Sequence, residues 1–328
     1  MKVLILRFSS IGDIVLTTPV IRAVKQQVPN VELHYATKTA FKDVLAPNPY
    51  IDKLHLLGKE KGDLRALISV LRAEKFDFVI DLHNNLRTRI IKTALGTKSR
   101  SFNKLNWQKW LLVRFKINKL PNVHIVQRYL DAAAPLGIKD DGLGLDYYIP
   151  ESAHIDIKSL PQEFQNGYTA YAIGGQHNTK ILPTDRIIEL CSLLNRPVVL
   201  LGGKEDAPAG EELAAAFKKP GYTGQTVIYN AAGKYTLNQS ASLLQQANEV
   251  FTHDTGLMHI AAALQKKIYS IWGNTVPEFG MYPYRTEFVV LERPNLYCRP
   301  CSKIGYKKCP EGHFKCMREI DFGVVNVQ

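Results

Sequence analysis

Apolar runs of strand length alternate with longer segments of helical periodicity along the first half of the chain. The apolar runs predict strands over residues 2–8, 31–36, 51–57 and 76–82. Residues 14–25 and 63–74 carry the helical pattern, and Pro19 is tolerated near the start of the first helix. This βαβ alternation predicts a parallel, doubly wound sheet with right-handed crossovers.

A second alternation follows a segment rich in Gly and Pro near residues 140–150. It predicts strands over 168–173, 197–201, 226–229, 249–252 and 267–272, and helices over 184–194, 205–218 and 236–246. A length of 328 residues exceeds one ordinary core. We therefore expect two Rossmann-like α/β domains, residues 1–150 and 151–328, whose strands point their carboxyl ends at a shared cleft.

A polar turn, Asp254-Thr255-Gly256, connects the strand that ends near residue 252 to a run of small residues containing Ala261. The turn predicts the start of a buried helix, and free N–H groups at such a start bind phosphate in open α/β folds. The alternative is a capped core helix in which His259 is only packed.

Two further strand-end turns carry polar groups. Ser9-Ser10-Ile11-Gly12-Asp13 follows the first strand, and Asp13 suits a general base that takes a proton from an attacking hydroxyl. The alternative role for Asp13 is a helix cap. Gly174-Gly175 precedes Lys180, which is placed to neutralise a diphosphate unless it is a solvated loop lysine. No G-x-G-x-x-G dinucleotide motif occurs in the chain.

A third strand-end turn, Gly202-Gly203-Lys204-Glu205, places Glu205 where it would reach a ribose or a base. With 45% hydrophobic and 22% charged residues, the chain is typical of a globular protein. Its first apolar run stops at Arg7, and no apolar stretch approaches the roughly 20 residues of a membrane helix. We expect a cytoplasmic protein, at most peripheral to the inner face of the cytoplasmic membrane.

The net charge of +12 is concentrated in one stretch. Residues 82–130 contain eleven of the 42 Lys and Arg residues and none of the 30 Asp and Glu residues. This predicts a polyanionic partner such as anionic lipid, a phosphorylated glycan or nucleic acid. Residues 105–117 mix Trp, Leu and Phe with Lys and Arg, as a helix in a lipid interface does. We expect Trp107 and Trp110 to fill the core of the first domain and the cations to carry the function.

Four cysteines, Cys298, Cys301, Cys309 and Cys316, lie within nineteen residues, with His313 among them. A structural zinc ion and disulfides are the alternatives, and a reducing cytoplasm disfavours disulfides. Cys191 lies among apolar neighbours in a helical segment and is expected in the core.

The motifs together resemble glycosyltransferase family 9, the ADP-heptose:lipopolysaccharide heptosyltransferases. The resemblance rests on residues 7–19, residues 81–87, Lys180 with Pro183, and residues 254–263, and it covers essentially the whole chain. It implies a GT-B architecture and inverting, metal-independent transfer of heptose from ADP-heptose to the inner core of lipopolysaccharide, with no cofactor.

The resemblance also implies roles for individual residues. Asp13 would be the general base, and Asp254 would contact the sugar hydroxyls. The diphosphate would be held by Lys180, Thr255, Gly256, Leu257 and His259. We expect the acceptor, a phosphorylated lipid A and inner core, to contact Ser9, Ser10, Gly12, Arg87 and Arg89.

Two positions depart from the family pattern. Gln176 stands where the family usually has Ser or Thr, and Leu182 stands where it usually has an aromatic residue. One alternative is therefore the same fold with another nucleotide sugar and a different surface-glycan acceptor. A more distant alternative is a basic nucleic-acid-binding protein, which would leave Asp13 and the Asp254-Thr255-Gly256 turn without a role.

Overall fold

The computed structural model describes residues 1–325, which form two compact units. The first comprises Met1–Leu105 and Val123–Tyr148. The second comprises Asn106–Asn122 and the chain from Ile149 onward. Residues 106–122 thus pack with the second unit, although they precede the predicted boundary at residue 150.

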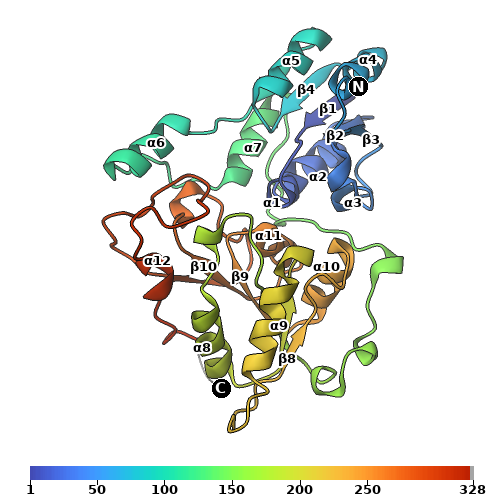
Figure 1. Cartoon of the computed structure of the whole chain (residues 1–328). Coiled ribbons are helices and arrows are strands. Elements are labelled where there is room, and N and C mark those ends of the chain that lie inside the picture. The colour runs from blue at the N-terminus through green and yellow to red at the C-terminus, as the bar shows by residue number, and fades with distance from the viewer. Residues whose placement is uncertain (326–328) are drawn as a thin grey trace. The chain divides into compact units, whose positions relative to one another are not determined.

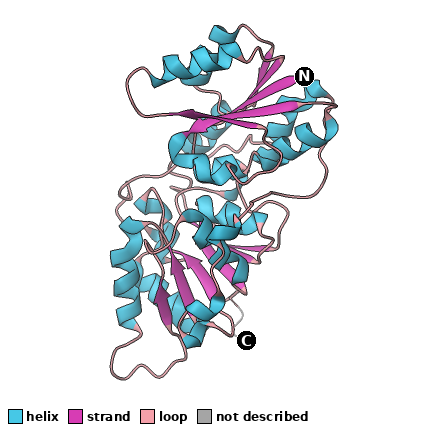
Figure 2. Ribbon diagram, turned by 90° about the vertical axis from the view of Figure 1, so that its right-hand side faces the viewer, coloured by secondary structure: helices cyan, strands magenta, loops and turns pink. Residues whose placement is uncertain are grey.

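The first unit is built on a five-stranded parallel sheet with helices on both faces (Figures 1 and 2). The strand order is β3-β2-β1-β4-β5. The strands are β1 (Lys2–Leu6), β2 (Glu32–Lys38), β3 (Lys53–Leu57), β4 (Phe78–Asp81) and β5 (Ser99–Ser101). The four strands predicted from the pattern are present, and β5 is an additional short edge strand.

The helices of the first unit are α1 (Ile11–Val15), α2 (Thr18–Gln27), α3 (Lys42–Leu45), α4 (Asp63–Ala73), α5 (Leu86–Leu95) and α7 (Ile125–Ala133). α2 packs against α7, and α4 packs against α5. The prediction of one helix over residues 14–25 was wrong, because the helix is interrupted between the end of α1 at Val15 and the start of α2 at Thr18. Pro19, in the first turn of α2, has no N–H to continue a helix from the preceding residues.

The second unit contains a six-stranded parallel sheet with the order β11-β10-β9-β6-β7-β8. Its strands are β6 (Thr169–Ala172), β7 (Val198–Leu201), β8 (Ile228–Asn230), β9 (Glu249–His253), β10 (Ile268–Trp272) and β11 (Phe288–Glu292). Its helices are α6 (Asn106–Phe115), α8 (Thr184–Leu194), α9 (Ala207–Ala216), α10 (Leu237–Gln246), α11 (Gly256–Ala263) and α12 (Lys315–Arg318). α8 packs on α9, and α10 packs on α11. The prediction of a doubly wound α/β fold is confirmed.

Strand order reverses once in each sheet. In the first unit β1 lies between β2 and β4, and in the second unit β6 lies between β7 and β9. Ligands of open α/β sheets bind beside the carboxyl ends of the two strands that flank such a reversal. The loops that follow β1 and β4, and those that follow β6 and β9, carry the predicted site residues other than Glu205, which follows β7.

The helix predicted near residues 105–117 is present as α6, but its tryptophans do not fill a core. Leu112 is buried against Val276 and Phe279 of the second unit. Trp107 is 64% exposed and Trp110 is 41% exposed. The prediction that they pack in the core of the first domain was wrong, since the helix packs elsewhere and through Leu112 instead. Cys191 is buried, as predicted. Over the described residues, no helix is both long and apolar enough to traverse a bilayer.

Candidate active site

Asp13 lies in α1, immediately beyond the carboxyl end of β1. Its carboxylate accepts hydrogen bonds from the backbone N–H of Ser10 at 3.1 Å and from the Ser10 hydroxyl at 2.8 Å. It also forms an ion pair with Arg7 at 2.7 Å, and its side chain is 21% exposed. The carboxylate therefore supports the first turn of α1 and still reaches solvent.

Arg7 orients this carboxylate from a buried position. Its guanidinium donates to the carbonyl oxygens of Ser9 and Leu82 and to the hydroxyl of Tyr129. Burial acts to lower the pKa of Arg7, but the charge of Asp13, the hydrogen bond to it and the nearby Tyr129 and Tyr35 together outweigh burial, and the pKa is raised. Because the guanidinium is held on three sides, it fixes Asp13 and links the ends of β1 and β4.

The loop after β4 adds further polar groups to this edge. Burial, reinforced by the charge of Arg7, lowers the pKa of His83 to about 4, so the imidazole is neutral at pH 7. Arg87 lies over the ring of Phe8 at 5.7 Å, while Arg89 is exposed. Both arginines were predicted to contact the acceptor. They lie in the first turn of α5, whose N-cap is Asn85.

Lys104 is a residue of this edge that sequence reasoning missed. Burial and then the charge of Arg7 lower its pKa, while Asp81 and Asp13 act in the opposite direction. In the sequence, nothing distinguishes it from the other ten Lys and Arg residues of the stretch 82–130. Asp81 itself is fully buried, pairs with Lys92 at 2.8 Å and accepts hydrogen bonds from the backbone N–H groups of His83 and Asn84, so it shapes the loop after β4.

In the second unit, Lys180 and Asp254 come together from the loops that follow β6 and β9. The Lys180 ammonium pairs with the Asp254 carboxylate at 2.5 Å and donates to the Asp254 carbonyl oxygen at 3.3 Å. The Thr275 hydroxyl donates to the same carboxylate at 3.0 Å. Side-chain exposures of 16% for Lys180 and 11% for Asp254 leave both groups accessible at this edge.

The first turn of α11 lies beside this pair. The helix begins at Gly256, as predicted, with Thr255 as its N-cap residue in an extended conformation. Gly175 approaches the turn closely, since a methyl group there would lie 3.1 Å from Ile181 and 3.6 Å from Thr255. Leu257 is half-buried and His259 is buried. The structure therefore brings a cation and unused helical N–H groups to one point, as anion binding requires.

A buried histidine anchors the loop that carries Lys180. His253, at the end of β9, accepts a hydrogen bond from the backbone N–H of Leu182 at 2.9 Å. Burial lowers the pKa of His253 to about 4, which keeps this nitrogen available as an acceptor. The Leu182 side chain is buried in the core of the unit, and Gln176 is exposed. Leu182 thus has a packing role.

Glu205 lies after β7, the strand next to β6, and is exposed. Its neighbour Asp206 accepts a hydrogen bond from the backbone N–H of Gly203 at 2.8 Å. The loop after β7 is therefore held by Asp206, and Glu205 is available to a ligand.

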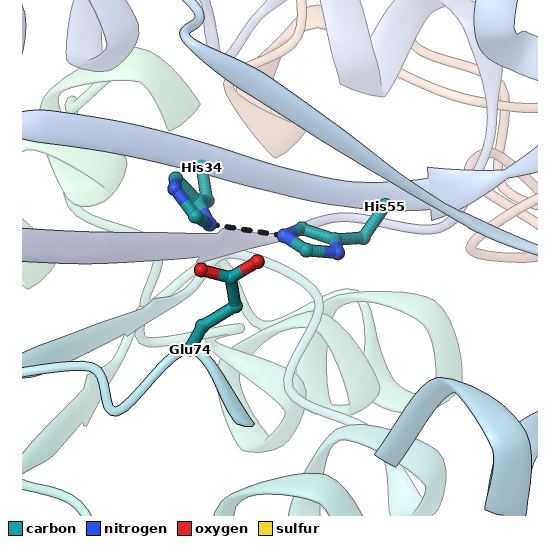
Figure 3. Close-up of side chains that lie close together, drawn as sticks. All are labelled: His34, His55 and Glu74. Atoms are coloured by element: carbon teal, nitrogen blue, oxygen red, sulfur yellow. Dashed lines mark hydrogen bonds between the residues drawn. The ribbon is translucent and has the colours of Figure 1, made fainter. Parts of the chain in front are cut away.

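Within residues 1–325, one group of side chains has the donor atoms and spacing of a metal site: His34, His55 and Glu74 (Figure 3). The two imidazoles are hydrogen-bonded at 3.0 Å, and the other nitrogen of His34 lies 2.8 Å from Glu32. Lys2 and Lys53 both donate to the Glu74 carboxylate. These two ammonium groups would repel a metal cation at the Glu74 carboxylate. We therefore interpret the three side chains as a structural hydrogen-bond network.

The cysteines near the carboxyl end are free thiols. The Cys298 sulfur lies 4.0 Å from Nε2 of His313, and Cys316 is buried in the core of the second unit. Burial raises the pKa of Cys301 to about 11 and that of Cys316 to about 12. These two thiols are thus protonated at pH 7. The segment that carries the cysteines contacts the Lys180 loop, because the backbone N–H of Tyr306 donates to the Thr179 hydroxyl at 2.8 Å.

The chain is similar to known proteins over most of its length. The family model described as glycosyltransferase family 9 (heptosyltransferase) matches residues 64–313, well over half of the chain. The chain belongs to glycosyltransferase family 9. The resemblance inferred from the motifs is therefore confirmed, and the chain is a glycosyltransferase.

Relatives within family 9 match over most of their length. Lipooligosaccharide heptosyltransferase 2 of Haemophilus influenzae is 27% identical over 298 residues, which is 85% of each chain. Lipopolysaccharide heptosyltransferase 1 of Campylobacter coli is 25% identical over 298 residues, or 84% of each chain.

Solved structures of the family share the fold. An ADP-heptose lipopolysaccharide heptosyltransferase II from E. coli matches with a TM-score of 0.68 at 20% identity, covering 97% of this chain and 98% of its own. A family 9 glycosyltransferase from Veillonella parvula matches with a TM-score of 0.70 at 22% identity, covering 88% and 85%. These matches confirm the predicted GT-B class of two Rossmann-like sheets.

Proposed function

We propose that this family 9 glycosyltransferase transfers a heptose from ADP-heptose to the inner core of lipopolysaccharide, with inversion and without a divalent metal. The observation that carries the proposal is the meeting of Lys180, Asp254 and the start of α11 at the strand reversal of the second unit. The relatives suggest the sugar and the glycan, since they are heptosyltransferases of lipopolysaccharide and lipooligosaccharide.

The donor half of the reaction follows from charge. When the bond between the anomeric carbon and the diphosphate breaks, negative charge builds up on the leaving ADP. The Lys180 ammonium and the N–H groups of Thr255, Gly256 and Leu257 would stabilise that charge, as preorganised donors do. His259, in the same first turn, would complete the diphosphate site. Asp254 would accept hydrogen bonds from the sugar hydroxyls, and Glu205 from the ribose or base.

The acceptor half needs a proton acceptor. Asp13 would take the proton of the acceptor hydroxyl as that oxygen attacks the anomeric carbon. Its carboxylate is held by Arg7 and Ser10, and its side chain is partly exposed to solvent. Ser9, Ser10 and Gly12 of the same turn, with Arg87 and Arg89 of α5, would bind the phosphorylated inner core. The acceptor is a lipid, so we place the reaction at the inner face of the cytoplasmic membrane.

The test mixes the purified protein with ADP-heptose and a deacylated inner-core acceptor, with and without EDTA. We expect release of ADP and a product heavier by one heptose, both insensitive to EDTA. Asp13→Asn should lower kcat by about 10²–10⁴-fold, because a general base contributes on that scale.

Asp63→Asn is the matched control, because Asp63 also supports the first turn of a helix in the same unit, through the N–H of Glu60 at 2.8 Å. It should retain full turnover. Normal turnover by folded Asp13→Asn protein would remove the proposed base, and loss of activity in EDTA that Mg²⁺ restores would remove the claim of metal independence.

A second candidate donor is favoured by the burial of Leu182. The family usually has an aromatic residue at this position, and a leucine in the core leaves base recognition to other groups. The donor would then be another nucleotide sugar with a different surface-glycan acceptor. A thermal-shift panel of nucleoside diphosphates separates the two, since the preferred ligand stabilises the fold most. A larger shift with UDP or GDP than with ADP would favour the alternative.

A further inference from the structure

The helix α6, labelled in Figure 1, exposes several aromatic side chains. Trp107, Trp110 and Phe115 are 64%, 41% and 52% exposed. The two indole rings stack with centroids 4.9 Å apart, and Trp110 meets Phe115 edge to face at 5.2 Å. Ile117, just beyond the helix, is 48% exposed. The three rings contact one another in series, and together with Ile117, which follows in the chain, we call them the α6 surface.

The second unit holds α6 from its other side. Leu112 packs against Val276 and Phe279. The Lys116 ammonium donates to the carbonyl oxygens of Cys298 at 3.1 Å and Pro300 at 2.7 Å. The helix is thus fixed at both its apolar face and its carboxyl end, and the aromatic cluster is presented outward by a docked element.

Cations from the same stretch of chain border the α6 surface. Arg114 and Lys119 are exposed at its carboxyl end, and Lys109 lies half-buried over the ring of Phe279 at 5.5 Å. No Asp or Glu occurs anywhere in residues 82–130. Tryptophan prefers the boundary between lipid and water, and Lys and Arg beside apolar rings favour anionic headgroups. A nucleic acid would pair with the cations but would leave Phe115 and Ile117 in water.

We propose that the α6 surface docks on an anionic lipid bilayer. Trp107, Trp110 and Phe115 enter the headgroup region, and Arg114 and Lys119 contact lipid phosphates. This proposal adds a membrane contact to the proposed function. It rests on that function in one respect, because it assumes a membrane-bound acceptor. Docking would hold the enzyme in the plane where such an acceptor lies.

The experiment measures binding of the full-length protein to vesicles of neutral phosphatidylcholine and to vesicles that also contain phosphatidylglycerol. We expect binding to the anionic vesicles, a blue shift of tryptophan emission, and weakening by salt. Buried Trp272 gives a constant background. The double variant Trp107→Ser/Trp110→Ser should bind about tenfold or more weakly, because two indoles no longer enter the interface.

Matched controls separate specific docking from bulk properties. Leu143→Ser removes a side chain that is 66% exposed in the other unit and should leave binding unchanged. Arg114→Gln/Lys119→Gln should weaken binding, whereas Lys218→Gln/Lys219→Gln, with the same change in charge at exposed sites, should not. Heptosyl transfer to a deacylated, water-soluble acceptor should be the same for the tryptophan variant and the wild type.

The outcomes distinguish this proposal from the proposed function. Anionic vesicle binding that depends on the tryptophans supports docking even where no transfer from ADP-heptose is found. Equal binding by the wild type and the tryptophan variant overturns docking on this surface, as does an absence of vesicle binding by the wild type. Tighter binding to single-stranded or duplex nucleic acid than to anionic vesicles also overturns it.

Discussion

Charged side chains at both strand reversals have their partners in place before any ligand arrives. Arg7 holds Asp13, and Lys180 holds Asp254. A charge without a partner in these largely buried positions would destabilise the folded protein. Each ion pair therefore stabilises the loop that carries it. In the proposed reaction a diphosphate would join Asp254 as a second anionic partner of Lys180, which needs no large movement of the lysine.

At the same scale, His55 makes a pH-dependent contribution to stability. Burial, with the neighbouring His34, lowers its pKa from 6.5 to about 4. The unfolded chain therefore binds more protons than the folded protein between these values. The contribution of His55 is complete above about pH 6.5 and is lost as the pH falls toward 4. The wild type should therefore lose unfolding free energy between pH 7 and pH 5. We expect this loss to be smaller in His55→Asn, by up to about 2 kcal/mol.

Urea unfolding followed by far-UV circular dichroism measures this difference at the two pH values. The variant also loses the hydrogen bond to His34, so its stability at pH 7 should fall, and the pH dependence is the informative quantity. His154→Asn, at an exposed position, should leave the pH dependence as in the wild type. An unchanged pH dependence in His55→Asn would contradict the buried, neutral imidazole.

At the scale of helices and strands, the hydrophobic pattern predicted the alternation and the turns at the strand ends. It could not predict β5, because Ser99–Ser101 is a polar edge strand with no apolar periodicity. Nor could it predict that Trp107 and Trp110 are exposed, since the packing partners of α6, Val276 and Phe279, lie more than 150 residues away in the chain. His34 and His55 meet only because β2 and β3 pair in one particular register.

The helix α2 is joined to the end of the first unit by one buried arginine. Arg22 is 3% exposed and donates to the Asp141 carboxylate at 2.6 and 2.9 Å and to the Gly144 carbonyl oxygen at 2.9 Å. It also pairs with Asp146. Arg22→Met would leave two largely buried carboxylates without their cation, and we expect a loss of about 3 kcal/mol in unfolding free energy.

Lys25→Met is the control on the same helix, because Lys25 pairs with Asp52 in a more exposed position. Its cost should stay below about 1 kcal/mol, as for most surface ion pairs. Both values come from urea unfolding followed by circular dichroism. A similar cost for the two variants would show that the Arg22 cluster adds no more than an ordinary surface pair.

At the scale of the whole molecule, the distribution of tryptophan provides a probe of one unit. Trp107, Trp110 and Trp272 all belong to the second unit, which also holds Lys180 and the start of α11. Tryptophan emission therefore reports on the unit that would bind the nucleotide, whereas circular dichroism reports on both. The first unit, which holds Asp13, contains no tryptophan among its residues.

Because ADP would bind only the folded second unit, it should raise the midpoint of thermal unfolding followed by tryptophan emission. At a ligand concentration of about 100 times Kd the gain is about 2.7 kcal/mol, which corresponds to roughly 5–10 °C for a unit of this size. Lys180→Gln should lose most of this shift, because the ammonium is the one cation paired within the turn, while Lys218→Gln, at an exposed site, should keep it. An equal ADP shift in Lys180→Gln and the wild type would place the diphosphate away from Lys180 and the first turn of α11, and the donor half of the proposed reaction would need another site.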